Sequence, residues 1–192
     1  IVTGYGGDDL LLLKTDGQGN EEWRKNFGRG EGNSVQQTVD GGFIVTGSDG
    51  FWDGDVLLLK TDGQGNEEWR KTFGSGWGLS VQQTVDGGFI VTGGDDDYDQ
   101  EGLLLKTDGQ GNEEWRKTFG RGGYSVQQTV DGGFIVTGGD WLLKTDGQGN
   151  EEWRKTFGEG SGYSVQQTVD GGFIVTGEDD EGDVLLLKTN EL

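Results

Sequence analysis

The chain has 192 residues, which fits one ordinary domain or a short array of repeats. Its 35 acidic residues outnumber its 15 basic residues and give a net charge of −20. This charge excludes a nucleic-acid binder that works by neutralising phosphates. The chain contains no Cys and no His, so disulfides, thiolate zinc sites and the commonest general base are also excluded.

The same blocks of sequence recur along the chain in a fixed order. An isolated Ile-Val-Thr-Gly opens the chain at Ile1, and Leu-Leu-Lys-Thr then occurs five times, with its lysine at Lys14, Lys60, Lys106, Lys144 and Lys188. Glu-Glu-Trp-Arg-Lys occurs four times, with its tryptophan at Trp23, Trp69, Trp115 and Trp153, in steps of 46, 46 and 38 residues. The block SVQQTVDGGFIVTG begins at Ser34, Ser80, Ser125 and Ser164. Such self-similarity predicts a repeat architecture.

Each repeat is predicted to form four short strands, which we call inner, second, third and outer. In the first full repeat, the inner strand covers residues 34–39 and alternates, with Val35, Gln37 and Val39 on one side. A tight Asp-Gly-Gly turn leads into the β-branched second strand at 41–47. The apolar run at 57–60 is the third strand, and the outer strand at 67–73 follows the turn Asp-Gly-Gln-Gly-Asn. We find no helical periodicity.

A repeat of this length with four antiparallel strands is typical of a β-propeller blade. We predict an all-β propeller of five blades, covering about 1–27, 34–73, 80–119, 125–157 and 164–190, in a single domain at 1–192. The first blade lacks an inner strand and the last lacks an outer strand, giving 18 strands. The alternative is an open β-solenoid or a stack of sheets. The near-identical repeats and the start within a strand indicate either a piece of a longer array or a designed chain.

The blocks DGGFIVTG, LLLKTDGQGNEEWRKTFG and SVQQT resemble a tandem repeat of secreted or surface proteins of archaea and bacteria. The segment LLLKTDGQGNEEW also resembles the strand-turn-strand of PQQ-type propeller repeats, although residues for a PQQ site are missing. The resemblance covers the whole chain. It implies a β-propeller, an extracellular or cell-surface location and a surface or binding role.

Sequence variation is concentrated in segments that a four-stranded meander places on one face. These segments are the connections between second and third strands and the crossings from each outer strand to the next inner strand. The second-to-third connections hold 16 acids and no base. A uniform scaffold with varied loops on one face is typical of a binding surface. The alternatives are drift in unconstrained loops, or acids that serve solubility or a halophilic surface.

Aromatic residues of the varied segments are the candidate ligand-binding residues, because solubility alone would not place tryptophan in a loop. They are Trp52, Trp77, Tyr98, Tyr124, Trp141 and Tyr163. Carboxylates at alternate positions of the same segments are candidate ligands for Ca²⁺. These are Asp53, Asp55, Asp95, Asp97, Asp99 and Glu101.

The sequence favours a non-enzymatic binding module. No His can activate the repeated Ser and Thr residues, and the predicted inner strands offer Gln36, Gln37 and their copies but no carboxylate pair. The expected ligand is a glycan or a protein, bound in a lectin-like manner by aromatic stacking and polar groups. The alternative is a structural or fibre-forming surface protein that self-assembles through open blade edges. No membrane insertion is expected, because no apolar run reaches the length of a membrane span.

Overall fold

A computed structural model describes residues 1–50, 54–94, 101–158 and 160–189, and over these residues the chain is all β. Its strands form five antiparallel sheets, which we call blades 1 to 5. Blade 1 contains β1 (Val2–Gly6), β2 (Asp9–Thr15) and β3 (Glu21–Arg29). Blade 2 contains β4 (Glu31–Gln37), β5 (Phe43–Ser48), β6 (Asp55–Thr61) and β7 (Glu67–Ser75). Blade 3 contains β8 (Trp77–Gln83), β9 (Phe89–Gly94), β10 (Glu101–Thr107) and β11 (Glu113–Arg121). Blade 4 contains β12 (Ser125–Gln128), β13 (Phe134–Gly138), β14 (Trp141–Thr145) and β15 (Glu151–Thr156). Blade 5 contains β16 (Ser161–Gln167), β17 (Phe173–Glu178) and β18 (Val184–Thr189).

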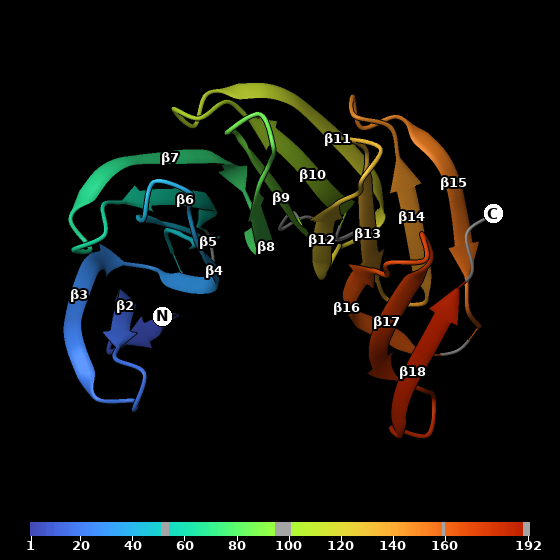
Figure 1. Ribbon diagram of the computed structural model, residues 1–192, viewed down its shortest axis with the longest axis horizontal. Helices are drawn as coiled ribbons and strands as arrows, with labels where there is room; N and C mark the ends of the chain where they lie inside the picture. The colour runs from blue at the N-terminus through green and yellow to red at the C-terminus, as the bar shows by residue number, and fades with distance from the viewer. Residues whose placement is uncertain (51–53, 95–100, 159, 190–192) are drawn as a thin grey trace.

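The blades follow one another around a central axis (Figure 1), and the strand order within each is that of a simple meander. The strands β4, β8, β12 and β16 line the inside of the arc, while β3, β7, β11 and β15 form its rim. The predicted propeller, with five blades and incomplete first and last blades, is confirmed. The arc is open between blade 1 and blade 5 (Figure 1). Within the described residues, no helix could span a lipid bilayer.

The hydrophobic core is divided among the interfaces between consecutive blades. At the interface of blades 2 and 3, Ile44 and Leu58 are fully buried against Phe89 and Leu105. The three other interfaces repeat this arrangement. The tryptophan of each outer strand packs on the phenylalanine that begins the second strand of the next blade, as with Trp23 and Phe43, whose ring centroids lie 5.8 Å apart. Each blade therefore buries its apolar faces only against its neighbours, which explains how a chain with few hydrophobic residues folds.

Side chains of the inner strands join consecutive blades by hydrogen bonds to the backbone. Between blades 2 and 3, the amide of Val81 donates to Ser34 Oγ at 3.3 Å, and the amide of Gln83 donates to Gln36 Oε1 at 2.6 Å. In return, Gln83 Oε1 accepts a hydrogen bond from the amide of Val39 at 2.9 Å. The same bonds recur between blades 3 and 4 and between blades 4 and 5. The repeated Ser and Gln residues thus satisfy backbone groups that the inner edge would otherwise leave open.

Each complete blade also buries one lysine between two carboxylates. In blade 2, the Lys60 side chain, which is 5% exposed, contacts Asp40 at 2.9 Å and Glu68 at 2.8 Å. Burial alone would lower the pKa of Lys60, but the hydrogen bonds to Glu68 and Asp40 raise it overall. The triad recurs at Lys106 with Asp86 and Glu114 and at Lys144 with Asp131 and Glu152. Blades 1 and 5 each keep one partner, because Lys14 contacts Glu22 and Lys188 contacts Asp170.

The inner strands end earlier than the alternation predicted. Thr38 and Val39 lie in the turn, and Val39 is 93% exposed instead of facing the core with Val35. The turn takes these residues because the amide of Thr38 bonds to the carbonyl of Gly42, and Asp40 Oδ1 accepts from the Thr38 hydroxyl and the Gly42 amide. Gly41 supplies the positive φ of 85° that the turn requires.

Candidate functional site

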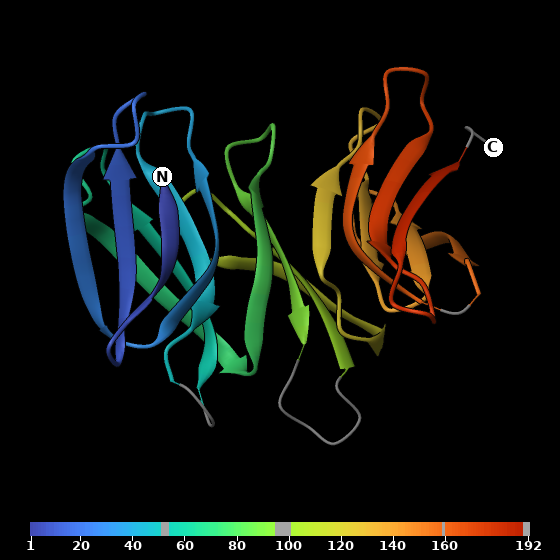
Figure 2. The same cartoon turned by 90° about the horizontal axis from the view of Figure 1, so that it is seen from below.

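The described parts of the varied segments share one face of the arc, as predicted. Figure 2 shows the crossings between β7 and β8 and between β11 and β12 at the same end as the connection between β17 and β18. The invariant turns, such as those around Gly41 and Gly87, lie at the opposite end. This separation follows from the antiparallel meander, in which alternate connections lie on opposite faces.

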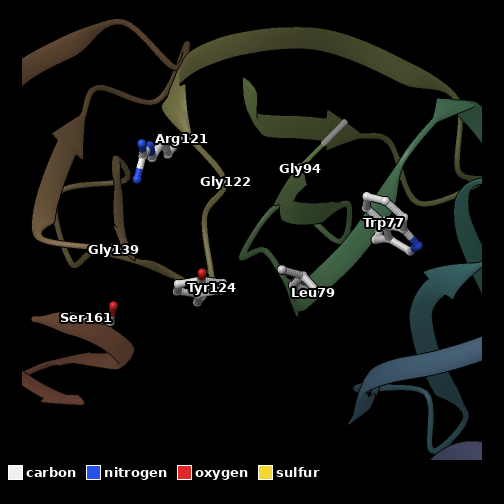
Figure 3. Close-up of a pocket in the computed structure, with 8 residues that line it drawn as sticks. All are labelled: Trp77, Leu79, Gly94, Arg121, Gly122, Tyr124, Gly139 and Ser161. Carbon is white, nitrogen blue, oxygen red and sulfur yellow. The ribbon is translucent and has the colours of Figure 1, made fainter. Parts of the chain in front are cut away.

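The varied face contains a pocket of about 310 Å³ between blades 3, 4 and 5. Trp77 and Leu79 of β8 line one side, Ser161 of β16 lines the other, and Tyr124 lies between them (Figure 3). Its remaining lining residues are Gly94, Arg121, Gly122 and Gly139. The described lining combines two aromatic rings, one guanidinium, the hydroxyls of Tyr124 and Ser161, and backbone at three glycines. None of the described lining residues is acidic, although the face as a whole carries many acids.

The pocket forms where two connecting segments of blade 4 are shorter than those of its neighbours. The crossing into blade 4, residues 120–124, is one residue shorter than the crossing into blade 3, residues 74–79. Trp77 opens β8 opposite Gly94, and Ser161 opens β16 opposite Glu178, whereas β12 begins only at Ser125. The connection from β13 to β14 is also reduced to residues 139–140. Blade 4 therefore has no strand residue at the position that Trp77 holds in blade 3 and Ser161 holds in blade 5. The pocket lies at this position, between blades 3 and 5.

The aromatic residues of the inner strands form a continuous surface beside the pocket. Tyr124 and Tyr163 occupy the same repeat position, directly before the inner-strand serine, where blades 2 and 3 carry Asn33 and Leu79. The rings of Tyr124 and Tyr163 meet edge to face with centroids 5.6 Å apart, and they are 41% and 46% exposed. The Tyr163 hydroxyl donates to Glu178, and this bond raises the pKa of Tyr163. This hydrogen bond orients the Tyr163 hydroxyl while the side chain remains exposed to solvent.

Arg121 differs from the arginines of the outer strands. Arg24, Arg70, Arg116 and Arg154 each pair with the glutamate three residues earlier at 2.9 Å. Arg121 is exposed and forms no ion pair among the described residues, even though Glu101 lies opposite it in the ladder of β10 and β11. Its guanidinium therefore remains available to a ligand in the pocket.

The predicted ligand-binding residues fall into three groups. Trp77 and Tyr124 line the pocket, and Tyr163 contacts Tyr124. Trp52 and Tyr98 lie outside the described residues. The third group is Trp141, which the structure places in the core, contrary to the prediction.

Trp141 is a core residue and does not present its ring to a ligand. It is 5% exposed, and its ring lies 5.2 Å from that of Phe119, centroid to centroid. The Arg154 guanidinium covers the ring at 5.6 Å. Because only two residues separate β13 from β14, Trp141 becomes the first residue of β14 and enters the interface of blades 3 and 4.

The predicted calcium ligands are mostly outside the described part of the chain, which omits Asp53, Asp95, Asp97 and Asp99. The two described members, Asp55 and Glu101, begin β6 and β10 in different blades. Among the described residues, no three acidic side chains gather in a group that could hold a metal ion. Calcium binding on this face stays a prediction for the undescribed loops.

Six described lining residues are not among the ligand-binding residues that the sequence predicts: Leu79, Arg121, Ser161 and the glycines at 94, 122 and 139. The available signal is the 38-residue step between Trp115 and Trp153, which is 46 residues in the two earlier repeats. It reflects two shortened segments, the crossing at 120–124 and the connection between β13 and β14. Both remove residues from the same face of the same blade.

The fold is that of solved β-propellers. A protein of unknown function from Bacteroides caccae is 14% identical, with a TM-score of 0.66 over 97% of this chain and 70% of that chain. The WD40 β-propeller domain of Doa1 is 12% identical, with a TM-score of 0.74 over 98% of this chain and 63% of that chain. The Dos1 propeller is 14% identical, with a TM-score of 0.68 over 93% of this chain and 50% of that chain.

These likenesses show the fold alone. The chain spans less than two thirds of the length of the Doa1 domain and half the length of the Dos1 chain. No protein-family model matches the chain, and no curated protein matches its sequence. The resemblance to secreted surface repeats remains a prediction from sequence.

Proposed function

We propose that this chain is a non-enzymatic binding module that acts outside the cell and recognises a ligand on its varied face. The supporting observation is the pocket, where residues that differ between repeats converge on an otherwise uniform scaffold. The described lining offers no pair of carboxylates and no nucleophile with a base, because these residues include one serine and no acid, and the chain contains no histidine. Binding is the chemistry that such a lining supports.

Between a glycan and a protein ligand, the pocket favours a glycan. Its volume of about 310 Å³ is at the lower end of small-molecule sites and suits one or two sugar rings. Trp77 and Tyr124 offer flat apolar surfaces for the C–H face of a sugar, while Ser161 and the glycine backbone offer hydrogen bonds to hydroxyls. A protein ligand would use the wider face, including Tyr163.

Replacing Trp77 by Ser is expected to weaken glycan binding about tenfold or more, through the loss of stacking worth about 1.4 kcal/mol. Serine is chosen because Ser161 occupies the same repeat position in β16, so the fold accepts it. A glycan array identifies the ligand for the parent chain, and calorimetry then measures the affinity of the variant.

The matched control is Tyr5→Ser, which removes an aromatic side chain that is 67% exposed but does not line the pocket. It should bind like the parent. If the parent chain binds no glycan on the array, the glycan assignment is wrong. If Trp77→Ser and Tyr5→Ser weaken glycan affinity equally, the glycan does not bind in the pocket.

A second candidate is the structural, self-assembling role. Val184 and Leu186 of β18 are 90% and 65% exposed, whereas their counterparts Val56 and Leu58 of β6 are 1% and 0% exposed beneath blade 3. Val2, at the other end of the arc, is 55% exposed. Unprotected apolar strands of this kind invite association with another chain.

We expect the parent to self-associate at micromolar concentration in sedimentation velocity, and Leu186→Glu to reduce that association. Val85→Glu is the matched control, because Val85 is 93% exposed in a turn on the invariant face. A parent that stays monomeric as its concentration rises would remove the structural role from consideration.

A further inference from the structure

We propose that the pocket at blade 4 binds an acidic sugar residue, with the Arg121 guanidinium paired to the sugar carboxylate. This inference rests on the proposed function and specifies its ligand class. Of the lining residues that the structure describes, Arg121 is the charged one. The planar guanidinium can hold a carboxylate with two parallel hydrogen bonds, a geometry that lysine cannot match.

The repeats themselves indicate that Arg121 is not needed for folding. The position two residues after the outer-strand phenylalanine carries Arg29, Ser75 and Arg121 in the first three crossings. Ser75 ends β7 just as Arg121 ends β11, so an intact outer strand forms without a charge there. Arg121 therefore supplies a local property that the scaffold does not require.

Among the described residues that line the pocket none is acidic, which makes this part of the face suited to an anion. The face carries most of the net charge of −20, and a carboxylate placed beside those acids would be repelled. Inside the pocket, the nearest side chains are Trp77, Leu79, Tyr124 and Ser161, which are uncharged. A carboxylate at Arg121 therefore meets an opposite charge at contact distance, while Glu101, the acid opposite Arg121 in the ladder of β10 and β11, forms no ion pair with it.

The remaining lining suits the rest of a sugar ring. Trp77 and Tyr124 come from the inner sides of blades 3 and 4 and form two walls of the pocket (Figure 3). Ser161 lies across from Trp77 and can exchange hydrogen bonds with a ring hydroxyl. The glycines at 94, 122 and 139 let a ligand approach the backbone closely, since they carry no side chains of their own.

The affinity of the pocket for an acidic sugar should depend on salt in an unusual way. The distant acids of the protein repel an acidic sugar, and salt screens this repulsion because the Debye length is about 8 Å at physiological ionic strength. The contact between Arg121 and the carboxylate is much shorter and is screened less. Moderate salt should therefore strengthen binding of the acidic sugar, or leave it unchanged, where an ordinary ion pair would weaken.

The test compares sugars that differ only in a carboxylate. The probes are oligosaccharides of galacturonic acid against galactose and of glucuronic acid against glucose, with binding followed by saturation-transfer NMR and calorimetry. We expect the acidic member of a pair to bind about tenfold or more tightly, as for a charge-assisted hydrogen bond. Arg121→Ser introduces the residue that blade 2 carries at this position, Ser75. This variant should bind the acidic sugar with no higher affinity than the neutral one.

The matched control is Arg29→Ser, which removes the same charge from the equivalent position of the first crossing, away from the pocket. Arg29→Ser should bind acidic sugars more tightly than neutral ones, as the parent does. If neutral and acidic sugars bind the parent equally, or if Arg29→Ser and Arg121→Ser lose the preference alike, the acidic-sugar assignment is overturned while the glycan-binding function stands. If no sugar binds but peptides with a free carboxyl terminus do, both the assignment and the glycan function are wrong.

Discussion

Replacing Lys106 by Met is expected to lower the free energy of unfolding by about 2 kcal/mol, in the range for losing hydrogen bonds to a charged group, because the lysine is buried while Asp86 and Glu114 are about half exposed. The Lys106 side chain is 4% exposed and contacts Asp86 at 2.9 Å and Glu114 at 2.8 Å. It also donates to the carbonyl of Thr107 at 3.0 Å. Methionine fills most of the space but leaves two carboxylates facing each other and a carbonyl without its donor. Chemical denaturation of the parent and the variant measures the difference.

The chain contains its own control for this substitution. Lys188 occupies the same repeat position in β18, but its side chain is 44% exposed and its described ion-pair partner is Asp170. Lys188→Met should cost at most about 1 kcal/mol, as for an exposed ion pair. Similar losses for the two variants would show that burial of the lysine is not what makes the triad stabilising.

The triads also predict how stability depends on pH. Burial raises the pKa of Asp86, but hydrogen bonds from Thr84, Lys106 and the Gly88 amide outweigh it and bring the pKa to about 2, from an ordinary value of 3.8. Since the folded-state pKa is lowered, the contribution of Asp86 is present above about pH 4 and is lost as the pH falls toward 2. Lys106→Met removes part of this shift, so the stabilities of parent and variant should converge in acid. If the difference in the free energy of unfolding between parent and variant stays constant down to pH 2, Lys106 does not contribute to the lowered pKa of Asp86.

The sequence predicted the repeat unit, the strand order and the incomplete end blades, because these depend on patterns that each copy displays by itself. It did not predict the triads, because their members come from a turn, a third strand and an outer strand. Asp40, Lys60 and Glu68 meet only when β5, β6 and β7 are folded side by side. The available signal was a lysine at the end of every apolar run.

The candidate site was predicted in part for a similar reason. The varied face and the aromatic positions Trp77 and Tyr124 could be inferred from meander geometry alone. The pocket could not, because it results from side chains that are missing at blade 4 and present in its neighbours. The same shortening moved Trp141 from a loop into the core, where it packs on Phe119. Loop length, and not residue type alone, decided which aromatic residue faces solvent.

Replacing Gly93 by Ala should be among the most damaging single substitutions, lowering the free energy of unfolding by about 3 kcal/mol, at the upper end of overpacking effects. A Cβ at Gly93 would lie 1.8 Å from the carbonyl oxygen of Trp77 and 2.9 Å from its carbonyl carbon. Both are backbone atoms of β8, paired alongside β9, so no side-chain rotation can relieve the contact. The inner strand itself must move.

Gly4 is the matched control, since it holds the same repeat position in β1, where a Cβ would meet no atom within 4 Å. Gly4→Ala should leave the free energy of unfolding within about 0.5 kcal/mol of the parent, as for ordinary surface substitutions. If both alanine variants lose stability equally, the glycine is required for the strand itself and not for close approach of the inner strand. If only Gly93→Ala is destabilised, we expect it also to lose glycan affinity under conditions where it remains folded, because the backbone that must shift is the segment that carries Trp77 into the pocket.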